Sequence, residues 1–120
     1  MAGADSRAVI YKICPADLWR AAEGDGVFRG APVDLQDGFI HFSTAAQVAE
    51  TAAKHFAGQR DLLLIAVEGL ALGDAVRWER SRGGDLFPHL YGTLALSAVR
   101  NVHPLPLGPD GHIFPDLLAL

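Results

Sequence analysis

The chain has 120 residues and a net charge of -4, with 50% hydrophobic and 20% charged residues. This length and composition are typical of one folded domain and argue against a disordered chain. The acidic balance, with Lys12 and Lys54 as the only lysines, makes nonspecific nucleic-acid binding unfavourable. The single cysteine, Cys14, excludes an internal disulfide and a cysteine-based zinc site, and we expect it to be structural and partly buried.

The sequence contains no repeat and no linker, so we expect residues 1–120 to form a single domain. The longest apolar run, residues 62–67, is too short to cross a bilayer. Residues 1–8 lack the apolar region of a secretory signal and are expected to be a flexible N-terminus. These features predict a cytoplasmic protein without a membrane partner.

The front of the chain predicts a strand, a helix and a loop in that order. Residues 9–13 are β-branched and aromatic, as in a strand. Pro15 suits the first turn of a following helix, and Gly24 and Gly26 are expected to stop it. Residues 27–38 contain glycine, proline and scattered polar residues, and predict a surface loop.

The middle of the chain predicts a second strand that leads into a second helix. Residues 39–42 form the strand, and Thr44 with Gln47 matches a capping box, in which side chains satisfy free N–H groups at a helix start. Apolar residues four apart then predict a helix over residues 45–57, ended by Gly58.

The back of the chain predicts further strands and an extended tail. Residues 62–67 read as a buried central strand, and residues 76–79 as another, followed by a loop over residues 80–85. Residues 94–99 and 99–105 supply one or two more. Residues 104–120 are rich in proline and predict an extended tail. Together the elements predict an α+β fold with a mixed or antiparallel sheet and two main helices.

A histidine in the strand over residues 39–42 is the first candidate for chemistry. Alternation places Phe39, His41 and Ser43 on one face of this strand. His41 either fills the core as a structural histidine or acts as a base, acid or orienting donor, because imidazole titrates near neutral pH. The strand leads to a helix N-terminus, which favours anions. Ser43 and Thr44 lie there as helix caps or as ligand contacts.

A second histidine lies among aromatic residues in Phe-Pro-His-Leu-Tyr-Gly (residues 87–92). His89 belongs either to an aromatic plug against the sheet or to the same pocket as His41. Tyr91 offers a hydroxyl donor. Glu79 is either solvated or turned into this pocket as a proton acceptor, on the face opposite to Trp78.

Three other sets of residues leave alternatives open. Lys12, within the first strand, either lies at a sheet edge or binds a ligand. Arg77, Arg80 and Arg82 form either a solvated loop or the mouth of an anion site. His41, His89 and Glu79 resemble a two-histidine, one-carboxylate metal site in composition, but their spacing gives no support for one, and we predict no metal.

These motifs together make the chain similar to the bacterial family catalogued as domain of unknown function 952 (DUF952), over residues 9–104. No single segment is specific to the family, but the combination is. The matching pieces are residues 10–13, Trp19, Asp-Gly-Phe-Ile-His-Phe-Ser (residues 37–43) with Gln47, residues 55–56, Trp78-Glu79 and residues 87–92.

That family resembles a distant branch of the ADP-ribosyltransferase-like superfamily. The resemblance implies a split, mixed β-sheet with flanking helices and a cleft that holds NAD or an ADP-ribose-like nucleotide. His41 and Ser43 match the superfamily residues that contact the nicotinamide-side ribose, and Tyr91 or Trp78 matches the aromatic residue on the nicotinamide ring. Glu79 and His89 compete for the third catalytic position.

Three functions follow from these patterns. The first is a transferase that uses NAD, with His41 orienting the ribose and Glu79 or His89 completing the site. The second is a non-catalytic module that binds a small molecule or nucleotide in the same pocket. The third is an enzyme of the RNA 2′-phosphotransferase type, which the scarcity of basic residues argues against.

Overall fold

The computed structural model describes residues 8–81 and 84–117. The predicted flexible N-terminus falls almost wholly outside these residues, as do Arg82 and the last three residues of the predicted tail. The helices are α1 (Ala16–Asp25), α2 (Pro32–Asp37) and α3 (Val48–His55), with 3-10 turns at Gly69–Ala75 and Leu96–Ala98. The strands are β1 (Val9–Pro15), β2 (Val27–Phe28), β3 (Ile40–His41), β4 (Leu62–Glu68), β5 (Val76–Arg80), β6 (Leu86–Leu90), β7 (Leu94–Ala95), β8 (Val99–Leu105), β9 (Leu107–Gly108) and β10 (Gly111–His112).

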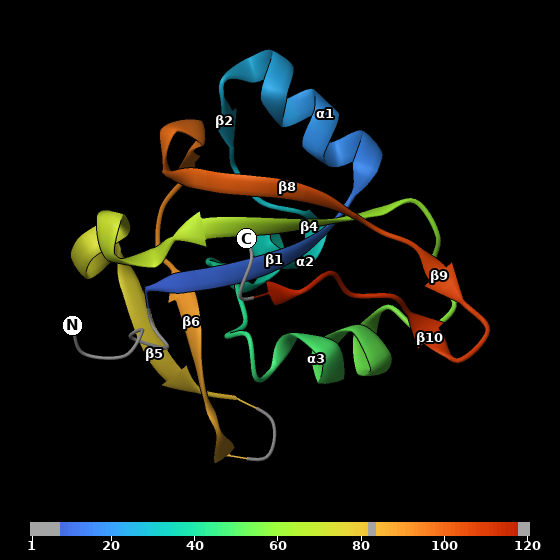
Figure 1. Cartoon of the computed structure of the whole chain (residues 1–120). Coiled ribbons are helices and arrows are strands. Elements are labelled where there is room, and N and C mark those ends of the chain that lie inside the picture. Colours follow the sequence, from blue (N-terminus) through green and yellow to red (C-terminus); the bar gives the residue numbers. More distant parts are fainter. Residues whose placement is uncertain (1–7, 82–83, 118–120) are drawn as a thin grey trace.

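The longest strands form an antiparallel sheet in the order β1-β4-β8, which crosses the middle of the molecule (Figure 1). β4 is its central strand and is buried on both faces, since Leu62 to Val67 alternate between two hydrophobic clusters. A continuous apolar run is typical of a strand that is covered on both sides. The prediction of a buried central strand at residues 62–67 is therefore confirmed.

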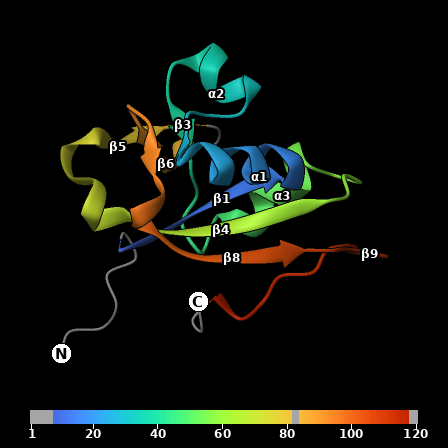
Figure 2. The same ribbon diagram turned by 90° about the horizontal axis from the view of Figure 1, so that it is seen from above.

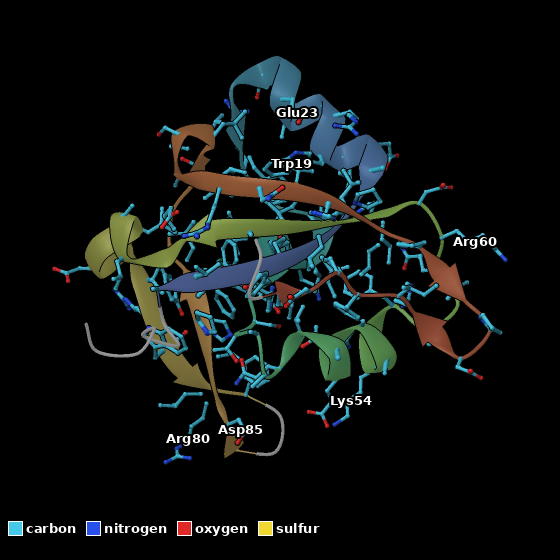
Figure 3. All side chains as sticks on the ribbon, in the orientation of Figure 1. Trp19, Glu23, Lys54, Arg60, Arg80 and Asp85 are labelled. Atoms are coloured by element: carbon cyan, nitrogen blue, oxygen red, sulfur yellow. The ribbon has the colours of Figure 1, made fainter. Side chains whose placement is uncertain are left out.

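Helices cover the two faces of this sheet. Trp19 and Ala22 of α1 pack into the first hydrophobic cluster, and Val48 and Ala52 of α3 pack into the second. Side chains three or four apart share a helix face, which explains both sets. Figure 3 shows Trp19 on the side of α1 toward the sheet, whereas Lys54 projects from α3 away from it.

A second antiparallel sheet, in the order β3-β6-β5, lies beside the edge of β1 that faces away from β4. Tyr11 and Ser43 join the two sheets through a pair of backbone hydrogen bonds of 2.8 Å each. In Figure 2, α2 and β3 lie beyond β1, on the side opposite to β8. This divided arrangement leaves side chains of both sheets facing a shared space.

The predicted loop over residues 27–38 is wrong in part, because it contains α2 and the short strand β2. Pro32 occupies the first turn of α2, where its missing N–H costs nothing. Asp34 accepts the backbone N–H of Ala31 at 2.7 Å, and Gly38 ends the helix with a φ of 87°. The proline and glycine that suggested a loop therefore mark the two ends of a helix.

Other elements differ from the prediction in length. α3 spans Val48–His55 rather than residues 45–57, because residues 45–47 form a turn before it. β3 is limited to Ile40–His41, and residues 94–98 divide into β7 and a 3-10 turn before β8 begins at Val99. The strand β6 was not expected, since Pro88 cannot donate to a neighbouring strand and argues against a strand interior.

The expected α+β class with an antiparallel sheet is confirmed, whereas Cys14 is more buried than the sequence predicts and Pro15 ends β1 rather than lying in the first turn of α1. The described residues form an α+β domain in which every strand pairing is antiparallel. Residues 104–116 carry strands rather than helix, and Phe114 packs against the second cluster. Cys14 is fully buried, and burial raises the pKa of its thiol to about 11. Within residues 8–81 and 84–117, no helix is long and apolar enough to cross a membrane.

Candidate functional site

A pocket of about 410 Å³ lies between the edge of β1 that faces away from β4 and the second sheet, β3-β6-β5. This volume is within the range of sites for small molecules. α2 and α3 contribute to its walls. It is lined by Tyr11, Lys12, Ile13, Val33, Asp37, His41, Phe42, Ser43, Thr51, His55, Phe56, Ser81, Phe87 and His89.

The two candidate histidines converge on this pocket from neighbouring strands. His41 on β3 lies directly opposite His89 on β6 in the strand register, and their ring centroids are 5.6 Å apart. Phe39 stacks on His89 with a centroid distance of 4.1 Å and contacts His41 at 4.6 Å. Residues directly opposite each other on antiparallel strands have neighbouring side chains, which explains the convergence of two histidines far apart in sequence.

A buried carboxylate that the sequence analysis did not identify holds His41 in place. Asp34 Oδ1 accepts hydrogen bonds from His41 Nδ1 at 2.7 Å and from the His41 backbone N–H at 3.1 Å. Lys12 Nζ lies 2.9 Å from Asp34 Oδ2, and the two side chains are 5% and 1% exposed. Buried charges are stable only when they are paired and hydrogen-bonded, and Asp34 supplies the pairing.

The ionised form of Asp34 is favoured by its partners. Burial alone would raise the pKa of Asp34, but the hydrogen bond from His41 and the charge of Lys12 outweigh this effect and lower the pKa to about 2. Asp34 is therefore a carboxylate at neutral pH. A lysine buried within an apolar strand requires a counter-charge, and this requirement is the signal in the sequence from which an acidic partner of Lys12 could have been inferred.

The second ring nitrogen of His41 faces another carboxylate. His41 Nε2 lies 2.9 Å from Asp37 Oδ2, at the end of α2. The side chains of His41 and Asp37 are 29% and 42% exposed, and both line the pocket. The exposed carboxylate of Asp37 is thus a neighbour of His41 that a ligand can reach.

His89 is held from the other side by Glu79 and is nearly buried. Glu79 Oε1 lies 2.8 Å from His89 Nδ1 and accepts the Tyr91 hydroxyl at 2.8 Å. Hydrogen bonds from His89 and Tyr91 lower the pKa of Glu79, and the bond to Glu79 raises the pKa of Tyr91. Glu79 and Tyr91 do not line the pocket; Glu79 contacts His89, which does, and Tyr91 contacts Glu79.

Two hydroxyls form a chain in the pocket wall. Thr51 Oγ1 donates to the backbone carbonyl of Gln47 at 3.2 Å, and Ser43 Oγ lies 2.9 Å from Thr51 Oγ1. Because the single Thr51 proton goes to the Gln47 carbonyl, Ser43 donates its own proton to Thr51. Ser43 Oγ then keeps its lone pairs for a donor in the pocket.

The other predicted site residues lie outside the pocket lining. Gln47 Oε1 accepts the backbone N–H of Thr44 at 3.0 Å, which is one half of the expected capping box. Trp78 packs against the first hydrophobic cluster, on the face of β5 opposite to Glu79, as alternation predicts. Arg77 lies over the Tyr91 ring at 4.5 Å, and Arg80 donates to the carbonyl of Gly84 at 2.7 Å.

The described residues do not have the geometry of a metal site with two histidines and one carboxylate. Among them, no three His, Cys, Asp or Glu side chains are placed to hold a metal ion together. His41 and His89 instead each carry their own carboxylate partners. The pocket is thus lined by the imidazoles of His41, His55 and His89, by the hydroxyls of Tyr11, Ser43, Thr51 and Ser81, and by the carboxylate of Asp37. Asp34 and Glu79 lie behind His41 and His89.

Comparison with known proteins identifies the family of the chain. A model of the family described as a protein of unknown function (DUF952) matches residues 13–102. The crystal structure of CC0527 from Caulobacter crescentus has a TM-score of 0.88 at 50% identity, over 93% of this chain and 99% of that one. The solution NMR structure of CC0527 has a TM-score of 0.79 at 50% identity, over 88% and 90% of the two chains. No curated protein matches. The chain therefore belongs to the DUF952 family.

Proposed function

We propose that the pocket binds NAD or an ADP-ribose-like nucleotide and that the chain is an ADP-ribosyltransferase-like enzyme. The observation that carries this proposal is the placement of His41 and His89 side by side on one pocket, with ring centroids 5.6 Å apart. Two separate sheets with a pocket between them are compatible with the split-sheet fold of that superfamily. The catalytic assignment of His41, His89 and Glu79 belongs to the same proposal.

The polar groups of the pocket suit the hydroxyls of a ribose. Ser43 Oγ and the Asp37 carboxylate offer hydrogen-bond acceptors to the pocket, and a ribose diol presents two donors. A ligand hydroxyl can also take the place of Asp37 at His41 Nε2. Lys12 is neutralised by Asp34, so phosphate groups of the ligand are expected outside the deep part of the pocket.

The same groups suit the transition state for breaking a nicotinamide–ribose bond. This reaction develops positive charge on the ribose, and fixed negative groups stabilise such charge. Asp37 lines the pocket, and Glu79 lies behind His89. Holding the ribose in one orientation lowers the barrier further, because the reacting groups need no reorganisation.

Isothermal titration calorimetry with NAD and with ADP-ribose tests the proposed ligand. We expect saturable 1:1 binding that is lost in His41→Ala and His89→Ala, while circular dichroism shows an unchanged fold. His103→Ala is the matched control, since His103 does not line the pocket, and it should bind like the wild type. Absence of binding heat with every adenine nucleotide would contradict the proposal.

Release of nicotinamide distinguishes an enzyme from a binding module. The enzyme proposal predicts turnover of NAD that Glu79→Gln reduces with little change in affinity. Binding of NAD without nicotinamide release, with or without an added acceptor, would instead support a non-catalytic nucleotide-binding module.

A further inference from the structure

We propose that His89 is the general base of this site and that Glu79 and Tyr91 are positioning residues behind His89. The group that His89 deprotonates is a hydroxyl, either of water or of an alcohol. This proposal rests on the proposed function in one respect, because it takes NAD as the substrate. It assigns different roles to Glu79 and His89, because only His89 lines the pocket.

The hydrogen bonds around His89 determine which nitrogen carries the proton. Glu79 is ionised at neutral pH and can only accept, so His89 Nδ1 donates to it across 2.8 Å. A neutral imidazole that carries its proton on Nδ1 has a free lone pair on Nε2. The bond to Glu79 uses only Nδ1, and the His89 side chain, which is 6% exposed, lines the pocket.

Packing fixes the plane of the ring. Phe39 stacks on the imidazole with an interplanar angle of 24°, and His41 meets its edge at 69°. The Tyr91 hydroxyl donates to the same oxygen of Glu79, which holds this carboxylate in position. A base that is held rigidly toward one point can take a proton without the cost of reorientation.

Glu79 itself is poorly suited to be the base. Hydrogen bonds from His89 and Tyr91 lower the pKa of Glu79, and a less basic carboxylate accepts a proton less readily. Arg77, directly opposite His89 on β5, adds positive charge next to Glu79 through its position over Tyr91. The carboxylate is therefore placed to orient the imidazole and to stabilise its charged form, as in a carboxylate–histidine pair of a hydrolase.

The reaction step balances with water or an alcohol as acceptor. The hydroxyl gives its proton to His89 Nε2, and its oxygen forms a bond to the anomeric carbon of the ribose. The bond from this carbon to the nicotinamide nitrogen breaks, and its electron pair neutralises the positive charge of the pyridinium ring. His89 then releases the proton to solvent.

Long-range ¹H–¹⁵N NMR of the histidine rings tests the assignment without any substrate. We expect the neutral ring of His89 in the free protein to carry its proton on Nδ1. A neutral ring protonated on Nε2 would overturn the proposal whether or not NAD binds. This outcome differs from failure of the proposed function, which is the absence of nucleotide binding.

Kinetics with NAD separate a base from a binding residue. Because general bases contribute factors of about 10²–10⁴, His89→Ala and Glu79→Gln should lower kcat for nicotinamide release at least about 100-fold. The Kd of NAD in Glu79→Gln should change less than about threefold. Glu68→Gln is the matched control, since Glu68 pairs with Arg100 away from the pocket, and it should leave both values unchanged. An unchanged kcat with a weakened Kd in Glu79→Gln would overturn the proposal.

Discussion

Asp34 is the residue on which the geometry of the pocket depends most. Its two oxygens accept hydrogen bonds from Lys12, from the His41 ring and backbone, and from the backbone of Ala31. One side chain thus neutralises a buried lysine, orients a pocket histidine and caps a helix. A sequence pattern could point to a partner for Lys12, but only the folded chain selects Asp34, because the pairing spans 22 positions.

The first prediction concerns the loss of this carboxylate. Asp34→Asn should lower the free energy of unfolding at neutral pH by about 3–5 kcal/mol, because it leaves the buried charge of Lys12 uncompensated. Urea denaturation measures the change. Glu50→Gln removes an exposed pair with Lys54 and should change stability by less than about 0.5 kcal/mol. A loss below about 1 kcal/mol in Asp34→Asn would contradict the assigned role.

The second prediction follows from the pKa of Asp34. In the folded state the pKa of Asp34 is about 2, below its ordinary value of 3.8. Between these values the unfolded chain binds the proton more readily, so stability is fully present above about pH 4 and is lost as the pH falls toward 2. The free energy of unfolding should fall by about 2 kcal/mol over this pH range. The Asp34→Asn variant should not show this fall. Equal slopes of stability against pH in both proteins below pH 4 would contradict this.

At the scale of elements, α2 brings Asp37 into the pocket lining and places Asp34 against the ring of His41. The sequence predicts a loop here because proline and glycine usually interrupt structure, and a six-residue helix has too few apolar positions to show a helical period. β6 was missed for a related reason, since Pro88 lies inside it. By contrast, the end signals Pro15 and Gly26 predict the longer α1, and apolar spacing with a capping box and Gly58 predicts α3.

The third prediction concerns the end of α2. Gly38 has a φ of 87° and open space where a side chain would lie. Gly38→Ala should therefore cost about 1–2 kcal/mol of stability from backbone strain alone. Gly24→Ala is the control, because Gly24 lies within α1 at ordinary φ with equal space, and it should stabilise by about 0.5–1 kcal/mol. Equal effects of the two substitutions on the free energy of unfolding would contradict the reason given.

At the scale of the whole molecule, one sheet connects the two hydrophobic clusters. β4 contributes Ile65 to the first cluster and Leu64 to the second, and both side chains are fully buried. The α+β class and the central strand could be predicted from composition and periodicity. The separation of the two three-stranded sheets, β1-β4-β8 and β3-β6-β5, and the pocket between them could not be predicted, because they depend on which distant strands pair.

The fourth prediction is that the two clusters unfold together. Ile65→Ala and Leu64→Ala should each cost about 2–5 kcal/mol. In both variants, tryptophan fluorescence, which reports on the first cluster through Trp19, should change at the same urea concentration as circular dichroism. Separate transitions for the two signals would mean that the clusters are independent.

The most direct test of the central proposal is an NMR titration of the histidine rings with NAD. The resonances of His41 and His89 should shift together along one saturation curve, because both rings line the same pocket. His103 and His112 do not line it and should stay unchanged. Saturable binding of NAD that leaves the rings of His41 and His89 unaffected, or no binding at all, would contradict the proposal.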